Sequence, residues 1–254
     1  MLQLYIGNKN YSSWSLRPWL VLKAFDLPFH EIKLRLSQDP QSAFKRTLAA
    51  IGAPTGRVPV LVDDGLLVWD TLAICEYLAE RFEHEPLWPQ EAAARARARS
   101  ICAEMHAGFT ALRTHCPMNI EADLPEVGRR VLAQEAGVAL DLARIAGMWG
   151  ELLAEHGGPW LFGAFSIADA YFAPVCSRIQ TYHLPLPQDA AAYQQRVLAH
   201  PAMQAWMADA RAEKDFVGFD EPYRAGTGTG TGPGTGQGIT QGGAAAGQPG
   251  ADDL

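Results

Sequence analysis

The sequence lacks the features that mark several large classes of protein. Its 254 residues include 21 lysines and arginines against 28 aspartates and glutamates, so there is no basic excess to neutralise nucleic-acid phosphates. No uninterrupted apolar run reaches the roughly 18 residues that suggest a membrane-spanning helix. The N-terminus shows no basic segment followed by an apolar stretch and a small-residue cleavage site. We therefore expect a cytoplasmic protein that binds neither nucleic acid nor membrane.

Cysteine is scarce, and the common metal motifs are missing. The four cysteines form no C-x-x-C pair, and no H-E-x-x-H motif occurs. His106 and His115 lie nine residues apart on one predicted helix, which is not a spacing that ligates a metal. We expect no metal site and four thiols buried as small apolar side chains: Cys75, Cys102, Cys116 and Cys176.

The composition itself is that of a folded protein, with 48% hydrophobic and 19% charged residues. The first eighty-odd residues alternate strand and helix. Hydrophobic periodicity and turn residues predict strands at 2–6, 30–36, 58–62 and 66–69, and helices at about 15–25, 40–50 and 71–82. Pro18 is expected in the first turn of its helix, where its missing N–H matters little. This order predicts a first α/β domain over 1–83, with a mixed sheet covered by helices.

Beyond this domain the strand signal disappears. A connector at 84–90 contains two prolines and separates the domains. Helices are then predicted at about 91–115, 124–156, 166–182, 189–198 and 201–214, which makes residues 91–224 an all-α bundle. Residues 225–254 are rich in glycine and have almost no large apolar side chain, so we expect a disordered tail there.

The segment 11–18, YSSWSLRP, connects the first strand to the first helix. Ligands of open α/β sheets bind at the carboxyl ends of the strands, and a helix N-terminus there attracts anions. A serine hydroxyl at that point could donate a hydrogen bond to a thiolate and so lower the pKa of the thiol. A serine here could equally cap the helix, and this segment alone leaves both interpretations open.

Two further segments fit a ligand site. Val58-Pro59 opens the third predicted strand, and a cis bond would turn its backbone groups towards a ligand, although most such bonds are trans. Asp70-Thr71 stands at the start of a predicted helix. Asp70 could pair with a ligand ammonium group, and Thr71 with the adjacent N–H groups could meet a carboxylate; both could also be simple caps.

In combination, these segments resemble the glutathione transferase superfamily over about residues 1–215, in particular its serine-type, zeta- and theta-like members. The resemblance implies a thioredoxin-like N-terminal domain and an all-α C-terminal domain. It implies that Ser12, or its neighbour Ser13, activates the thiol of glutathione, with Tyr11 as an alternative hydroxyl donor. Arg17 matches the basic position that follows the serine turn.

The resemblance also assigns the rest of the glutathione site. Val58-Pro59 matches the cis-proline step that pairs with the cysteinyl unit, and Asp70-Thr71 matches the Glu-Ser pair that holds the γ-glutamyl group. Arg57 stands where a residue approaches the glycyl end. The chain departs from the zeta pattern at Trp14, where that pattern has cysteine, and at Asp70, which is one methylene shorter than glutamate.

The helical domain contributes a folding motif and a set of pocket candidates. Ser166 and Asp169 form an S-x-x-D capping box at the start of a helix, and we expect this pair to serve folding. Trp14, Met105, His106 and Phe109 are candidates to line the second-substrate pocket. The interpretation of Met105 and Phe109 as core residues remains the alternative.

The resemblance implies a homodimeric, detoxifying enzyme without a permanently bound cofactor, in which the thiolate of glutathione as co-substrate attacks a small hydrophobic electrophile. A glutathione-dependent isomerase or peroxidase of the zeta-like type is an alternative within the same chemistry. A non-catalytic binding protein that keeps the fold is an alternative of another class.

Overall fold

The first domain is built on a four-stranded mixed sheet. In the computed structural model, which describes residues 1–224, the strand order is β2-β1-β3-β4. The strands are β1 (Leu2–Ile6), β2 (Phe29–Lys33), β3 (Val60–Asp63) and β4 (Leu66–Trp69). β1 pairs in parallel with β2 and antiparallel with β3, which in turn pairs antiparallel with β4. Asp64 and Gly65, with φ of 46° and 91°, form the two-residue turn between β3 and β4. The predicted mixed sheet is confirmed.

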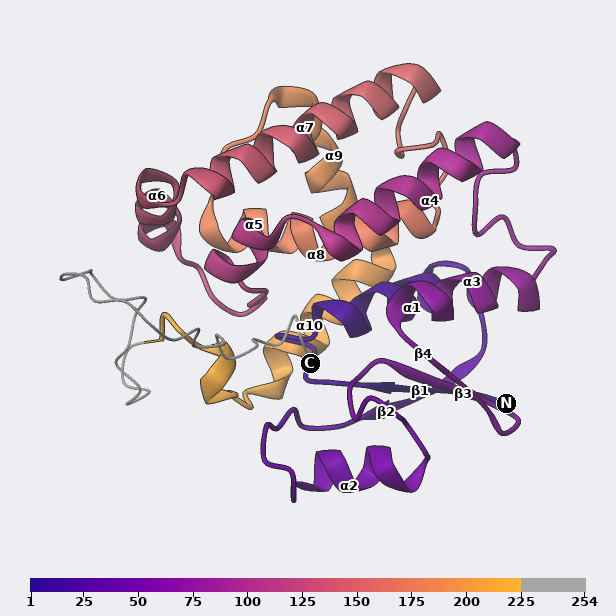
Figure 1. Ribbon diagram of the computed structural model, residues 1–254. Coiled ribbons are helices and arrows are strands. Elements are labelled where there is room, and N and C mark those ends of the chain that lie inside the picture. The colour runs from indigo at the N-terminus through magenta and orange to yellow at the C-terminus, as the bar shows by residue number, and fades with distance from the viewer. Residues whose placement is uncertain (225–254) are drawn as a thin grey trace, which may run out of the picture.

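Helices cover both faces of this sheet (Figure 1). They are α1 (Ser13–Ala24) and α3 (Thr71–Arg81) on one face and α2 (Ala43–Ala50) on the other. Side chains of β1 alternate between the faces, as the strand period requires. Leu4 and Ile6 join the main core with α1, whereas Tyr5 packs with Phe44 of α2 in a second, smaller core.

The second domain is all-helical, as predicted, but two of the long helices expected from the sequence are each divided. Its elements are α4 (Ala92–Ala107), α5 (Thr110–His115), α6 (Pro125–Gln134), α7 (Ala136–His156), α8 (Ile167–Tyr182), α9 (Gln188–Ala199), α10 (Pro201–Glu213) and the short η1 (Gly218–Asp220). Gly108 is extended and Phe109 is left-handed with φ of 54°, which ends α4 and starts α5. Glu135, with φ of −119° and ψ of 82°, separates α6 from α7.

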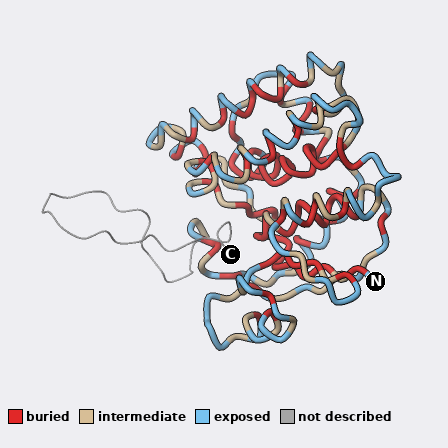
Figure 2. The backbone as a smooth tube through the Cα atoms, turned by 45° about the vertical axis from the view of Figure 1, so that its right-hand side comes forward, coloured by how far each residue is buried: buried red, intermediate tan, exposed pale blue. Residues whose placement is uncertain are grey.

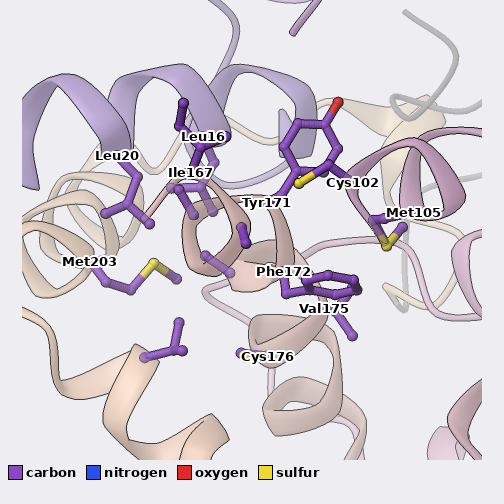
Figure 3. Packing of buried hydrophobic residues seen from close by; sticks show 14 of the residues in the cluster. Leu16, Leu20, Cys102, Met105, Ile167, Tyr171, Phe172, Val175, Cys176 and Met203 are labelled. Carbon is purple, nitrogen blue, oxygen red and sulfur yellow. The ribbon is translucent and has the colours of Figure 1, made fainter. Parts of the chain in front are cut away.

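The α8 helix forms the centre of the molecule. It packs against α1 of the first domain and against α4, α6 and α9 of its own. Figure 2 shows the buried residues gathered in this middle region, and Figure 3 shows Leu16 and Leu20 of α1 beside Ile167 of α8. The predicted capping box is confirmed at its start, because Asp169 accepts the Ser166 N–H (2.9 Å) while the Ser166 hydroxyl faces the first turn. The two domains therefore share one core.

The segment after α10 returns to the first domain. Asp215 accepts a hydrogen bond from Arg35 (2.9 Å), and Val217 is buried in the smaller core beside Tyr5. Further along, Glu221 accepts a hydrogen bond from the Tyr11 hydroxyl (2.5 Å). The end of the helical domain thus anchors the turn that follows β1. The tail predicted at 225–254 lies outside the described residues.

Candidate active site

A pocket of about 390 Å³ lies between the two domains. Its walls come from the start of α1, the loop before β3, the junction of β4 with α3, and the region where α4 gives way to α5. The lining residues are Trp14, Thr55, Arg57, Val58, Pro59, Trp69, Asp70, Thr71, His106 and Arg113. The sequence segments singled out above at Trp14, at 57–59 and at 70–71 therefore meet in one place.

Val58 and Pro59 form the floor of the pocket on the sheet side. The Val58–Pro59 bond is cis, as predicted, and both residues are buried. The loop just before them is fixed by Lys45 of α2, whose Nζ donates a hydrogen bond to the Gly56 carbonyl (2.9 Å). Burial, with the neighbouring charge of Arg57, lowers the pKa of Lys45. Arg57 itself is exposed at the rim.

Asp70 combines a cap with an unusual backbone conformation. Its φ is +73°, a region that few residues other than glycine occupy, and asparagine and aspartate occupy it more readily than the rest. One carboxylate oxygen accepts the Leu72 N–H (2.9 Å) and caps α3. The other lies 3.5 Å from Nε2 of His106, across the pocket. The side chain is 46% exposed, so the carboxylate can meet a ligand from solvent.

A hydrogen bond links the start of α3 to α1, at a carbonyl that a proline in α1 cannot pair with. The helix begins at Ser13, so Pro18 lies in its interior and not in its first turn as predicted. A proline has no N–H to donate to the carbonyl four residues earlier, which here belongs to Trp14. The Thr71 hydroxyl donates to that carbonyl instead, at 2.8 Å. The broken helical hydrogen bond thereby positions Thr71 beside Trp14, and both line the pocket.

The two serines of the predicted thiol-activating turn are buried. The Ser12 hydroxyl donates to the Ser15 hydroxyl (2.7 Å), which in turn accepts the Gly7 N–H (3.2 Å). Ser13 is the first residue of α1, and its carbonyl accepts a hydrogen bond from Arg17 (3.0 Å). Of this turn, only Trp14 is among the lining residues of the pocket described above.

Arg17, predicted to touch glutathione, lies between the domains and is only 1% exposed. Its Nε donates to the carbonyl of Tyr171 in α8 (2.9 Å), and its guanidinium carbon lies 4.3 Å from the centre of the Trp14 ring. Arg17 is not a lining residue of the pocket. Arg17 therefore contacts Trp14, which lines the pocket, and joins α1 to α8 without lining the pocket itself.

The Tyr11 side chain is directed to the C-terminal segment. It is 1% exposed and its hydroxyl donates to Glu221, which also accepts from Asn119 (2.9 Å). Burial raises the pKa of Tyr11 well above its usual value, and the hydrogen bond to Glu221 adds to the rise. Tyr11 is therefore neutral, and its hydroxyl already donates a hydrogen bond to the Glu221 carboxylate.

The second-substrate candidates divide into two groups. Trp14 and His106 line the pocket, and their rings lie 4.9 Å apart. Met105 is fully buried in the main core, where Figure 3 shows it beside Tyr171 and Phe172. Phe109 is 7% exposed and belongs to the same core. Neither lines the pocket. Met105 and His106 are adjacent in the sequence. Since the side chains of adjacent helical residues point in different directions, Met105 lies on a different face of α4 from His106.

The structure also adds residues that the sequence analysis did not single out. Thr55 and Trp69 reach the rim, and Arg113 reaches the helical wall. Arg113 Cζ lies 5.1 Å from the centre of the Trp14 ring, and its NH1 group is 3.4 Å from the carbonyls of His106 and Gly108. Since the sequence predicted one continuous helix there, it gave no reason to expect Arg113 beside Trp14.

The four cysteines are buried and unpaired, as predicted. Within residues 1–224 no group of three or more His, Cys, Asp or Glu side chains is placed to hold a metal ion. No described helix is both long enough and apolar enough to cross a membrane.

Both domains of the chain are similar to known proteins. Residues 11–81 match the family described as glutathione S-transferase, N-terminal domain, and residues 90–209 match the glutathione S-transferase, C-terminal domain. A probable maleylacetoacetate isomerase of Caenorhabditis elegans is 28% identical over 72% of this chain and 81% of its own length. A maleylacetoacetate isomerase of Pseudomonas aeruginosa is 28% identical over 80% of this chain and 94% of its own.

Solved structures show the same fold. A Burkholderia glutathione transferase homolog with bound glutathione has a TM-score of 0.62 and 24% identity, and the match covers 84% of this chain and 99% of that one. A Sulfitobacter homolog, also with bound glutathione, has a TM-score of 0.58 and 23% identity over 81% of this chain and 96% of that one.

Proposed function

Because this chain belongs to the glutathione S-transferase family, we propose that it is an enzyme that binds glutathione in the pocket between its domains and lets the sulfur attack a small hydrophobic electrophile. One observation carries this proposal. Val58-Pro59, which precede β3, and Asp70-Thr71, at the start of α3, line a single pocket together with Trp14 in the first turn of α1.

Each part of glutathione has a complementary group in this pocket. The 46% exposed carboxylate of Asp70 would take the ammonium of the γ-glutamyl unit. The backbone N–H of Thr71, at the start of α3, would take its carboxylate. The Val58 backbone would pair with the cysteinyl unit, and Arg57 at the rim would take the glycyl carboxylate. The tripeptide would then span the pocket with its sulfur near Trp14.

The N-terminus of α1 would stabilise the thiolate. The dipole of this helix favours a negative charge at its N-terminal end. We propose that Ser12 or Ser13 adds a hydroxyl donor. Ser12 donates to Ser15 in the free protein, so a role in catalysis requires its hydroxyl to rotate towards the sulfur. Because the sulfur is deprotonated at neutral pH in this arrangement, it attacks the electrophile directly.

Serine-to-alanine variants test the thiolate step. If one serine is the donor, its replacement should lower kcat/KM for conjugation by about 1–2 powers of ten, the loss typical of one hydrogen bond to a charged group. The replacement of the other serine should have little effect, and each variant serves as the control for its neighbour. Ultraviolet absorbance of bound glutathione reports the thiolate directly. Wild-type rates in both variants would remove the serines from the mechanism.

A second candidate function is isomerisation that uses the same thiolate. Two relatives that align over most of their length carry the name maleylacetoacetate isomerase. An isomerase adds the sulfur to a double bond, allows rotation, and eliminates the sulfur again, so glutathione is not consumed. Measurement of glutathione before and after turnover of a maleyl-type substrate separates this reaction from conjugation.

We also propose that the enzyme works in the cytoplasm, in detoxification, as a homodimer. Two large apolar side chains of the edge strand β4, Leu66 and Trp69, are 51% and 44% exposed. Exposed apolar groups on an edge strand favour contact with a second protein surface. Light scattering during gel filtration tests the dimer, and a Leu66→Glu variant should shift the equilibrium towards the monomer.

A further inference from the structure

We propose that the second substrate carries a carboxylate or similar acidic group, which Arg113 and His106 bind while its apolar part packs on Trp14. This inference rests on the proposed function and names the class of electrophile for the same pocket. It differs from the proposed function in requiring a charged group on the substrate.

The charges that line the pocket are mostly positive. Arg57, His106 and Arg113 are basic, and Asp70 is the single acid among those residues of 1–224 that line the pocket. Bound glutathione would use Asp70 for its ammonium group and Arg57 for its glycyl carboxylate. The two basic groups that remain, His106 and Arg113, both belong to the helical domain, which faces the second substrate.

The break between α4 and α5 is what gives Arg113 this place. In a continuous helix, Arg113 would lie about 10 Å further along the axis than His106, because each residue adds about 1.5 Å. The extended Gly108 and the left-handed Phe109 instead turn the chain. The Arg113 NH1 group then reaches back to the carbonyls of His106 and Gly108, 3.4 Å from each. These contacts orient the guanidinium towards the indole.

The His106 ring is also fixed in place. Its Nδ1 lies 3.0 Å from the hydroxyl of Tyr171, and its ring lies 4.9 Å from that of Trp14. Its Nε2 faces the pocket at 3.5 Å from Asp70. If the ammonium of glutathione engages Asp70, Nε2 becomes available to a second ligand. The His106 ring and the Arg113 guanidinium would then both lie beside the Trp14 indole, next to the second substrate.

The indole at the centre of this group suits a flat substrate. Arg17 lies beneath the site with its guanidinium carbon 4.3 Å from the Trp14 ring, and it is 1% exposed. The Arg113 guanidinium carbon lies 5.1 Å from the centre of the same ring, so two positively charged side chains contact the indole. An electrophile that combines an aromatic or unsaturated body with an acidic group matches both the apolar ring and the positive surroundings.

A matched pair of substrates tests this inference on the whole enzyme at saturating glutathione. One is a chloronitrobenzoate and the other is the corresponding chloronitrobenzamide. In each reaction the thiolate sulfur bonds to the ring carbon, and chloride leaves with the bonding electron pair. The thiol proton has already passed to solvent. The two substrates differ in charge but hardly in shape. The ratio of kcat/KM for the benzoate to kcat/KM for the benzamide, each divided by its uncatalysed rate, therefore measures recognition of the acid.

We expect the wild type to favour the benzoate by roughly tenfold to a hundredfold, the range for one hydrogen bond between charged groups. Arg113→Gln should lower the rate with the benzoate more than the rate with the benzamide and so bring the two close together, and Arg113→Lys should restore part of the preference. Arg144→Gln, which removes an exposed arginine paired with Glu104, is the control and should leave the ratio unchanged. In the wild type, benzoate should compete with the electrophile better than benzamide does, a comparison that needs no variant.

Two results would overturn the inference. Equal wild-type rates for acid and amide would show that the pocket does not recognise the charge. An equal loss for both substrates in Arg113→Gln would assign Arg113 to the thiolate of glutathione. Failure of the proposed function looks different, because thiolate absorbance would then be missing and neither substrate would react.

Discussion

Replacement of Asp70 by asparagine separates its two roles, as the cap of α3 and as the partner of the glutathione ammonium group. Asparagine caps helices about as well as aspartate and tolerates a positive φ. The Asp70→Asn variant should therefore keep the hydrogen bond from the Leu72 N–H, now 2.9 Å, and the φ of +73°. We expect its free energy of unfolding to stay within about 0.5 kcal/mol of the wild type.

Binding should change much more than stability. A hydrogen bond between charged groups contributes about 1.5–3 kcal/mol when it is shielded from water. The Asp70 side chain is 46% exposed, so solvent screening reduces the expected contribution to about 1–2 kcal/mol. This corresponds to roughly 5- to 30-fold weaker binding of glutathione. Asp70→Ala should weaken binding similarly and, because it also removes the cap, lower the free energy of unfolding by about 1 kcal/mol.

Calorimetry with two ligands provides the assay. One ligand is glutathione, and the other is an analogue in which the α-amino group of the γ-glutamyl unit is replaced by hydrogen. The wild type should bind glutathione more tightly than the analogue, whereas Asp70→Asn should bind both alike, so the coupling energy of the cycle should be about 1–2 kcal/mol. A coupling energy near zero, with the fold intact, would refute the assignment of Asp70 to the ammonium group.

Two further predictions concern stability. Burial raises the pKa of Asp169 to about 6 and outweighs the hydrogen bonds that favour its ionised form, so the fold binds a proton that the unfolded chain releases above about pH 4. The free energy of unfolding of the wild type, relative to that of Asp169→Asn, should therefore fall by up to about 3 kcal/mol as pH rises from about 4 through 6. Urea titrations of both proteins across this pH range test the prediction. A relative rise in the free energy of unfolding with pH would contradict it. Thr71→Val should cost about 1–3 kcal/mol in urea titrations, because it leaves the Trp14 carbonyl without the donor that Pro18 cannot supply. Thr114→Val, an exposed position on α5, is its control, and equal stability of the two variants would show that water satisfies the carbonyl.

Features that depend on near neighbours could be predicted from the order of the residues. The apolar run of β1, the Ser166–Asp169 capping box and the change from alternating elements to helices were all predicted and are present. Each is decided by hydrogen bonds or side-chain periods within a few residues, so a local pattern is enough. The resemblance supplied Val58-Pro59 and Asp70-Thr71, which the structure brings to one pocket.

The positions of the helix breaks and the identity of the pocket-lining side chains depend on long-range packing. Phe109 adopts a left-handed conformation as its side chain enters the core, and the break brings Arg113 to Trp14. Arg17 and Met105, both expected at a ligand, are buried instead. The reason is physical: burial and the approach of residues distant in sequence depend on how the two domains pack around α8. No local pattern carries that information.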